Sequence, residues 1–146
     1  MMNVINRFNG EYAFLSNFVN CKVIYNENIY PTVEHAFQAA KCLDISIQKS
    51  FTTLVTPRDA KKLGKQVPLR PDWEQVKDDI MKDLLTQKFS QEPFKSQLLA
   101  TGNAKLIEGN TWNDTYWGVC NGKGLNMLGI LLMEVRDELR KDDIND

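Results

Sequence analysis

The sequence predicts an α+β fold, a helix-dominated single domain over residues 1–146 with a small antiparallel sheet. Three observations support this prediction. Short β-like segments occupy the N-terminal third, apolar residues recur at helical spacing through most of the rest, and no repeat or Pro/Gly/Ser-rich linker divides the chain. A domain of this length buries roughly two thirds of the surface that its unfolded chain exposes, so one core is enough.

The predicted strands come first in the chain. Residues 13–15, 22–25 and 29–30 are β-like, and Asn26-Glu27-Asn28 between the last two is a plausible hairpin turn. One more short strand is expected at residues 105–107. The sheet is therefore small.

The first helix is predicted to open at Pro31 and Thr32. Its apolar residues recur at i, i+3, i+4 and i+7, and they are Val33, Ala36, Phe37 and Ala40. We expect this stripe to face the core.

Further helices are expected after the first one, over residues 45–53, 57–65, 71–89, 92–100 and 126–140. Gly64 closes the second of these, and Pro71 suits the first turn of the third. The last helix is apolar on nearly all sides from Met127 to Met133, which indicates a central position.

The charge balance argues against a general nucleic-acid binder. Lys and Arg total 18 against 19 Asp and Glu, a net charge of -1, whereas proteins that hold duplex DNA by neutralising phosphates usually carry a basic surplus. One small ligand with a phosphate remains possible, because it needs only two or three aimed donors.

Cysteine usage and the chain start indicate a reduced, cytoplasmic protein. Cys21, Cys42 and Cys120 are odd in number and never form CxxC, which fits neither a disulfide framework nor a zinc site. The start MMNVINRFNGEY lacks the apolar run of a signal peptide, and no segment approaches the ~20 apolar residues of a membrane span. We therefore expect no membrane association and no metal.

A second stripe on the first helix carries reactive groups. Glu34, Gln38 and Lys41 lie at i, i+4 and i+7, at the edge of the apolar face. The α-carbons of Glu34 and Lys41 should lie about 10 Å apart along the axis, a span that a ribose could fill. The alternative is a solvated Glu-Lys stripe, because most charged residues are exposed. His35 points away from the stripe, and as a lone histidine it is either structural or catalytic.

The glycine-rich run at residues 109–126 is the second candidate. Four glycines alternate there with Trp112, Asp114, Tyr116 and Trp117. The aromatic faces could stack on a base, Asp114 could move a proton, and Gly122-Lys123-Gly124 could offer N–H groups to a phosphate. Alternatively the tryptophans cap the core and the glycines only turn the chain. Neither GxGxxG nor the Walker motif is satisfied, so no dinucleotide site is supported.

The opening segment and Trp73 each have both a functional and a structural interpretation. In the opening segment, residues 7–18, Arg7, Ser16 and Asn17 suit recognition of a phosphate or a sugar diol, but Ser and Asn also cap loops. Trp73 is either a core anchor or a stacking platform.

Six segments together resemble one family. They are FLSNF, YPTVEHAFQAAK, PLRPDW, LLATGNAKLIE, DTYWG and GLNMLGILLMEVR, and they run in the family's order from about residue 7 to residue 139. On these motifs the chain is similar to the NADAR (YbiA-like) family. The resemblance implies a YbiA-like fold and an N-glycosidase that needs no cofactor.

The resemblance also implies substrates and roles. Family members cleave the ribose C1′–N bond of phosphorylated ribosylaminopyrimidines from riboflavin synthesis, or of guanine bearing ADP-ribose, free or in nucleic acid. The acid of the family's EH motif falls on Glu34, its lysine on Lys41, its helix tryptophan on Trp73, and the D-x-x-W-G pair on Asp114 and Trp117. The family mechanism is thought to pass through a Schiff base on the lysine.

Residue reasoning and resemblance together define a candidate site. Glu34, Lys41 and Asp114 are the expected catalytic residues. The expected substrate-binding residues are Arg7, Ser16, Asn17, Gln38, Trp73, Trp117, Gly118 and Asn126. The phosphate cation stays open among Arg7, Lys65, Arg70 and Lys123.

The chemistry is consistent with these roles. A ribosylamine equilibrates with its ring-opened imine, so a neutral Lys41 could exchange with the base nitrogen while Glu34 or Asp114 moves protons. Two alternatives remain. Glu34 could activate water directly with Asp114 as the acid, or the chain could be a non-catalytic module that reads ADP-ribose through Trp73, Trp117 and residues 122–126.

Overall fold

The computed structural model describes residues 3–145, with side chains described through residue 143. The chain forms two compact units. Unit 2 is Asn17–Lys88, and unit 1 joins the residues up to Ser16 with those from Phe89 onward. Each unit is described below by itself, and the single-domain expectation stays a prediction.

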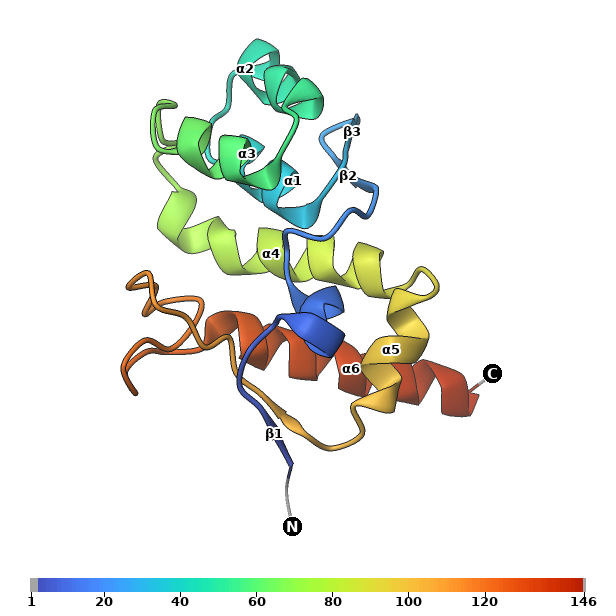
Figure 1. Ribbon diagram of the computed structural model, residues 1–146. Helices are drawn as coiled ribbons and strands as arrows, with labels where there is room; N and C mark the ends of the chain where they lie inside the picture. The colour runs from blue at the N-terminus through green and yellow to red at the C-terminus, as the bar shows by residue number, and fades with distance from the viewer. Residues whose placement is uncertain (1–2, 146) are drawn as a thin grey trace. The chain divides into compact units, whose positions relative to one another are not determined.

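Unit 2 is built around one short helix (Figure 1). Its elements in chain order are β2 (Val23–Tyr25), β3 (Asn28–Tyr30), α1 (Val33–Ala39), α2 (Ile45–Ser50), η2 (Phe51–Thr53), α3 (Pro57–Gly64) and α4 (Trp73–Phe89). Every residue of α1 is buried, and α1 packs against α3, η2, α2 and both hairpin strands. This all-round burial makes α1 the core element of the unit.

Local sequence signals explain how these elements begin. Asn26 and Glu27 have positive φ angles of 47° and 70°, the conformation that lets a two-residue turn match the strand twist of the antiparallel pair β2–β3. Thr32 caps α1 by accepting the backbone N–H of His35 at 3.0 Å, and Asp44 caps α2 in the same way. In α3, Thr56 forms a capping box with Asp59.

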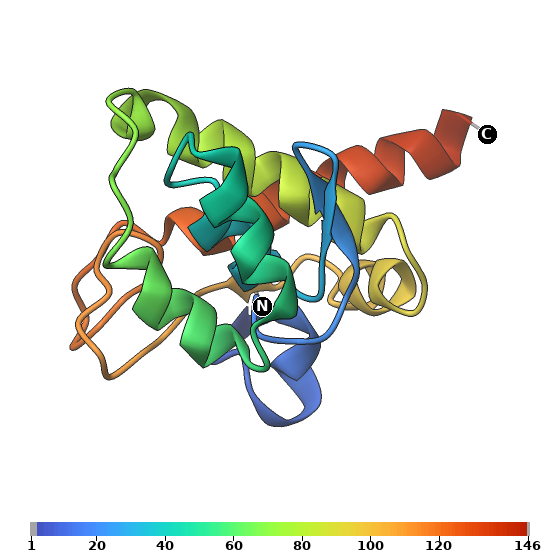
Figure 2. The same cartoon turned by 90° about the horizontal axis from the view of Figure 1, so that it is seen from above.

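Unit 1 combines a parallel strand pair with two helices, and the longer of them is the red helix that leads to the C-terminus in Figure 2. Its elements are β1 (Val4–Ile5), η1 (Gly10–Leu15), α5 (Phe94–Ala100), β4 (Lys105–Leu106) and α6 (Met127–Asn145). Strand β1 pairs with β4, with Val4 opposite Lys105, and α6 packs against β4 and α5. This pairing is what joins the two ends of the chain in one unit.

The predicted fold class is confirmed, with corrections in detail. The hairpin and each expected helix are present, although α1 ends at Ala39 and α4 begins at Trp73, two residues later than expected. The strand expected at residues 13–15 is wrong, because these residues lie in the 3-10 helix η1, where Ser16 donates its N–H to the carbonyl of Ala13. The parallel pair β1–β4 was not expected.

Helix α6 also differs from its expectation. It continues to Asn145, through a polar C-terminal stretch. Leu128, Leu132 and Val135 are buried, whereas Ile130 is 39% exposed, so one side of the apolar stretch faces solvent. Among the described residues, no helix is long and apolar enough to span a membrane.

Candidate active site

The polar stripe of α1 lies inside unit 2. Glu34 is 8% exposed and Gln38 is 5% exposed, so the alternative of a solvated stripe is wrong for these two residues. Lys41 is half-buried. It follows the C-cap Ala40, and its N–H donates to the carbonyl of Gln38, three residues back. The lysine therefore sits on a tightened final turn rather than within the helix.

Gln38 holds the Glu34 carboxylate. Its Nε2 donates to Glu34 Oε1 at 2.7 Å, while its Oε1 is buried with no hydrogen-bond partner among the described residues. The backbone N–H of Glu34 donates to the carbonyl of Asn17 at 3.1 Å. Asn17, in turn, donates its Nδ2 to the sulfur of Met81. Glu34 is thus fixed through both its backbone and its side chain.

The amine of Lys41 lies among charges that favour its neutral form. Burial lowers the pKa of Lys41 below its ordinary value of 10.5, and the nearby cations Lys65, Lys61 and Lys77 lower it further. The Glu34 carboxylate acts in the opposite direction and raises it. Because desolvation and like charges prevail, Lys41 is neutral over a wider pH range than an exposed lysine.

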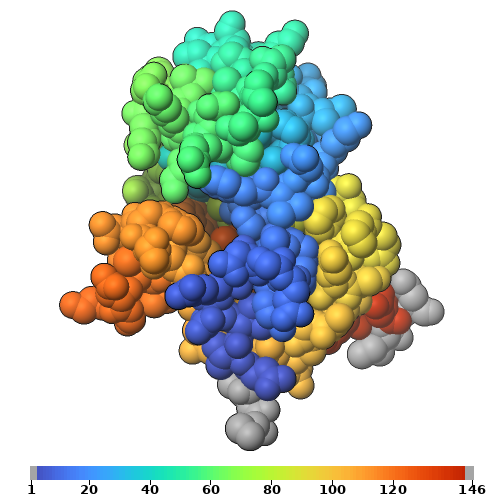
Figure 3. Space-filling model, viewed as in Figure 1, coloured from blue at the N-terminus to red at the C-terminus, as the bar shows by residue number. Residues whose placement is uncertain are grey.

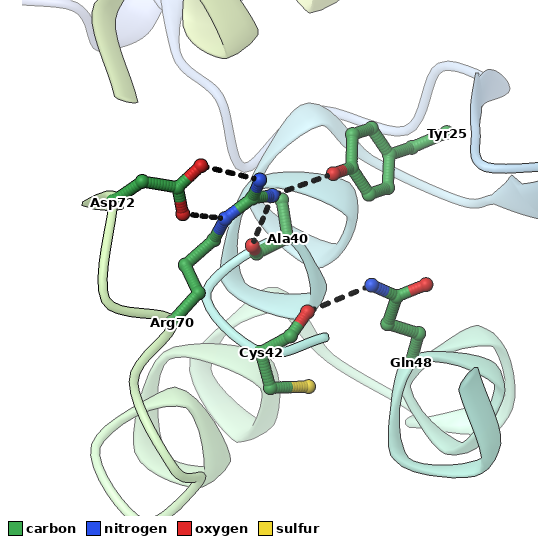
Figure 4. A network of polar contacts seen from close by, with 6 residues as sticks. All are labelled: Tyr25, Ala40, Cys42, Gln48, Arg70 and Asp72. Atoms are coloured by element: carbon green, nitrogen blue, oxygen red, sulfur yellow. Dashed lines mark hydrogen bonds and ion pairs between the residues drawn. The ribbon is translucent and has the colours of Figure 1, made fainter. Parts of the chain in front are cut away.

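Arg70 holds the backbone on either side of the bond between Ala40 and Lys41, and Figure 4 shows its contact with Ala40. Its guanidinium is paired with Asp72 through two hydrogen bonds of 2.6 and 3.0 Å. The same group donates to Tyr25 Oη at 3.2 Å and to the carbonyl of Ala40 at 3.5 Å. The backbone N–H of Arg70 donates to the carbonyl of Lys41 at 2.7 Å.

Gln48 completes this clamp one residue further along. Its Nε2 donates to the carbonyl of Cys42 at 2.7 Å, as Figure 4 shows. Its own backbone carbonyl accepts the hydroxyl of the buried Tyr30 at 3.0 Å. The carbonyl groups of Ala40, Lys41 and Cys42 therefore all have protein donors, and the chain at Lys41 is held in one position.

His35 has a structural role at the start of α1. Its Nδ1 lies 2.7 Å from Thr32 Oγ1 and its Nε2 lies 3.0 Å from the carbonyl oxygen of Leu54. A carbonyl can only accept, so Nε2 carries the proton and Nδ1 accepts from the threonine hydroxyl. Burial lowers the pKa of His35, and both ring nitrogens are engaged, which supports the structural alternative.

Trp73 packs on the helix that carries the site. It is 7% exposed, and its ring centroid lies 5.0 Å from that of Phe37, tilted by 51°. This geometry supports the core-anchor alternative. A stacking role toward substrate stays a prediction.

In unit 1, Asp114 and Trp117 lie in one ordered loop. Asp114 Oδ1 accepts the N–H groups of Tyr116 at 3.2 Å and Trp117 at 2.9 Å. The side chain of Asn110 accepts the N–H of Asp114 at 3.1 Å and donates to its carbonyl at 2.9 Å. Asn110 thus orders this loop, although the sequence analysis did not identify it as a structural or functional residue.

Gly118 and Asn126 shape the same loop. A Cβ on Gly118 would clash with Glu108, so only glycine fits there. Asn126 is 8% exposed and has a positive φ of 55°. Its Nδ2 donates to the carbonyl of Leu106 and its Oδ1 accepts the N–H of Glu108, both at 2.9 Å. These contacts are structural, and substrate binding by either residue stays a prediction.

The remaining candidates are Arg7 and Ser16. Arg7 is exposed, and Ser16 is half-buried at the end of η1. Their roles in substrate binding also stay predictions. Among residues 3–145, no group of three or more His, Cys, Asp or Glu side chains could hold a metal ion.

Lys88 is an amine that the sequence reasoning missed. It is fully buried, and burial lowers its pKa to about 8. Any chemical test of Lys41 must therefore distinguish the two lysines. Among the residues that position Lys41, Gln48 gave no sequence signal, and Arg70 was considered only as a phosphate ligand.

Comparison with known proteins identifies the family. The NADAR domain model matches residues 6–140, nearly the whole chain. The chain belongs to the NADAR family. The positions that carry the EH, QAAK and D-x-x-W-G motifs all lie within the matched range.

Similar proteins agree with this assignment. The N-glycosidase YbiA of Shigella flexneri serotype 5b is 43% identical over 88% of this chain and 82% of its own length. A riboflavin biosynthesis protein of Vibrio vulnificus is 34% identical over 89% of this chain but only 36% of its own length. The NMR structure of Escherichia coli YbiA superposes with a TM-score of 0.87 at 37% identity, covering 100% of this chain and 90% of that one. The YbiA-like fold is thereby confirmed.

Proposed function

We propose that this NADAR protein is an N-glycosidase that hydrolyses the ribose C1′–N bond of a phosphorylated ribosylamine or of ADP-ribosylated guanine. The observation that carries the proposal is a desolvated amine, Lys41, just after the C-terminal end of α1, under the electrostatic influence of a buried carboxylate, Glu34, in the first turn of the same helix. Relatives named N-glycosidase and riboflavin biosynthesis protein support the reaction class.

The first half of the proposed reaction replaces the base by Lys41. The ribosylamine ring opens, so that O4′ gains a proton and C1′ forms an imine with the base nitrogen. Neutral Lys41 Nζ adds to C1′, and Glu34 relays two protons in succession from Nζ to the base nitrogen, one on addition and one as the base leaves. The C1′–N bond then breaks, the base leaves as a neutral amine, and C1′ remains joined to Lys41 as an imine.

The second half releases the sugar. Water adds to C1′ of the imine, and Glu34 relays both protons of that water to Nζ, the first on addition and the second as the C1′–Nζ bond breaks. The products are the aldehyde form of the sugar, which closes again, and regenerated Lys41. One water is consumed for each base released, as hydrolysis requires.

The fixed geometry of the two groups supports this route. Gln38 orients the carboxylate, and Arg70 with Gln48 fixes the backbone of the lysine. Such preorganisation avoids the entropic cost of bringing the amine and the acid together on each turnover. Asp114 is proposed as a further proton-transfer residue, and this role rests on its place in the family motif.

The direct test is release of free base. The protein is incubated separately with a ribosylaminopyrimidine phosphate and with ADP-ribosylated guanosine, and the products are separated by chromatography. We expect release from at least one substrate. Lys41→Ala should abolish release, and Glu34→Gln should lower kcat by about 10²–10⁴, the usual contribution of a positioned proton-transfer group.

The matched control is Lys62→Ala, which removes an exposed lysine from α3 and should leave release unchanged. Thermal melts of each variant separate loss of chemistry from loss of folding. If the wild-type protein binds ADP-ribose tightly and releases no base from either substrate, the glycosidase proposal is wrong and the binding-module alternative is supported.

A further inference from the structure

Asn17 carries a buried amide group that makes little use of its hydrogen-bonding capacity. The residue is 8% exposed, and its Nδ2 donates only to the thioether sulfur of Met81, at 3.6 Å, which is a weak acceptor. Its Oδ1 is buried with no hydrogen-bond partner among the described residues. Most buried amide groups are paired, because an unpaired one destabilises the folded state. Asn17 therefore keeps a buried acceptor that a ligand could use.

Asn17 contacts α1 at Glu34. Its backbone carbonyl accepts the N–H of Glu34 at 3.1 Å, which places residue 17 beside the first turn of α1. A second buried acceptor without a partner among the described residues is Oε1 of Gln38, the residue that holds the Glu34 carboxylate. The two residues that hold Glu34 thus present two acceptors without donors. A ligand rich in hydroxyl groups would supply such donors.

Helix packing shields this part of unit 2 from bulk water. Helix α1 is buried along its whole length and packs against α2 and α3. The side chains of these two helices, teal and green, form the surface of unit 2 in the upper part of Figure 3. Hydrogen bonds are stronger in such surroundings, and a site built to bind a hydroxyl group strongly rejects a ligand that lacks it.

Rotation of the Asn17 amide can bring its oxygen to a ligand. The terminal torsion of an asparagine side chain is broad, and turning the amide gives up only the weak contact with Met81. The amide of Gln38 differs, because turning it would break the 2.7 Å hydrogen bond to Glu34, and its Oε1 is packed against Gly64. Of the two amides, only that of Asn17 can turn while the carboxylate stays held.

We propose that Asn17 Oδ1 accepts a hydrogen bond from the 2′-hydroxyl of the ribosyl substrate and makes the site selective for ribose over 2-deoxyribose. This inference rests on the proposed function, which brings C1′ to Lys41 and Glu34. The 2′-hydroxyl is bonded to the carbon next to C1′, so it comes close to the same carboxylate. The ribosyl group is common to both proposed substrates, whereas the leaving bases differ, which favours the sugar as the ligand of this acceptor.

Calorimetric titration of the full chain with sugar phosphates tests the inference without requiring turnover. The probes are ribose 5-phosphate, 2-deoxyribose 5-phosphate and arabinose 5-phosphate, in which the 2-hydroxyl is present, absent and inverted, respectively. We expect the wild-type protein to bind ribose 5-phosphate about tenfold or more tightly than either of the others, the usual effect of a hydrogen bond in a buried site.

Asn17→Leu replaces the amide by an apolar group of similar size and keeps the backbone bond to Glu34. The preference for ribose 5-phosphate should fall to about twofold or less, because leucine offers no acceptor. Met81→Leu is the matched control, because it removes the thioether partner of Asn17 but keeps Oδ1, and the preference should stay at the wild-type value. Each preference is a ratio of two affinities of the same variant, so a general loss of stability does not alter it.

Three results would overturn the inference. They are a wild-type protein that binds the three sugars alike or binds none of them, an Asn17→Leu variant that keeps the full preference, and an equal loss of preference in Asn17→Leu and Met81→Leu, which would assign Asn17 a packing role. The base-release assay is scored separately. Base release without any preference for ribose 5-phosphate would leave the glycosidase proposal standing without this contact, whereas an Asn17-dependent preference without base release would support the contact and refute catalysis.

Discussion

At the scale of single residues, Lys41 joins a fixed backbone to a reactive side chain. Its carbonyl accepts from the Arg70 N–H and its N–H donates to the carbonyl of Gln38, so the backbone that carries the amine is held in place. Its side chain is desolvated and surrounded by other cations. These conditions favour a neutral amine, which is the nucleophilic form.

The lowered pKa of Lys41 predicts a pH dependence of activity. The ratio kcat/KM should rise with pH as Lys41 loses its proton, and the midpoint should lie below 10.5. Replacing Lys65 by Met removes a charge that lowers the pKa of Lys41, so the midpoint should move to higher pH. Lys62→Met is the control. A pH–rate profile checks this, and an unchanged midpoint in Lys65→Met would contradict the electrostatic account.

Substituting Arg70 tests whether holding the backbone of Lys41 in place contributes to catalysis. Arg70→Lys keeps the charge but loses the fork that meets Asp72, Tyr25 and Ala40. We expect the free energy of unfolding to fall by about 1–3 kcal/mol and kcat to fall more than KM rises. Urea melts and steady-state kinetics measure both.

Tyr25→Phe is the matched control for Arg70→Lys, because it removes only the hydrogen bond between the Arg70 guanidinium and Tyr25 Oη. This substitution should lower the free energy of unfolding by about 1 kcal/mol or less. Full activity and stability in Arg70→Lys would show that the clamp has no role.

At the scale of elements, the contact between α1 and α3 positions the site. Gly64 is the last residue of α3, as expected, but its close contact with α1 was not expected. A side chain at this position would clash with Gln38, which orients Glu34. The glycine thus connects the packing of two helices to the orientation of a catalytic carboxylate.

Gly64→Ala tests this contact. Helix propensity alone would stabilise the variant by about 1 kcal/mol, whereas overpacking typically costs about 1–3 kcal/mol. We expect overpacking to prevail, with lower stability and lower kcat.

A double-mutant cycle isolates the clash with Gln38. In the Gln38→Ala background most of the clashing atoms are absent, so Gly64→Ala should no longer destabilise. Equal destabilisation by Gly64→Ala in both backgrounds, measured by thermal melts, would show that the clash is not the cause.

At the scale of the whole molecule, the near-zero net charge conceals an uneven distribution. Unit 2 holds 11 Lys and Arg residues against 9 Asp and Glu residues, a net charge of +2, whereas unit 1 holds 7 against 10, a net charge of -3. Total composition correctly showed no basic surplus. It could not show that four cations, Arg58, Lys61, Lys62 and Lys65, recur at helical spacing along α3 and its C-cap, because this follows from the order of the residues.

How far the sequence predicts the site depends on the range of the interaction. The helical spacing of Glu34 and Gln38 and the capping residue Thr32 are local, and the structure bears them out. The clamp of Arg70 and Gln48 on residues 40–42 joins segments that are distant in the chain, so no periodicity reveals it. The strand expected at residues 13–15 is wrong because strand propensity depends on a pairing partner, which these residues lack.

The central claim is that Lys41 forms a covalent bond to the sugar. The most direct measurement is borohydride reduction during turnover, followed by intact mass and peptide mapping. The account predicts one reduced sugar adduct per chain on the peptide containing Lys41, none on Lys88, and no adduct in Lys41→Ala. Base release with no adduct, or an adduct only on another residue, would contradict it and favour direct hydrolysis or a different nucleophile.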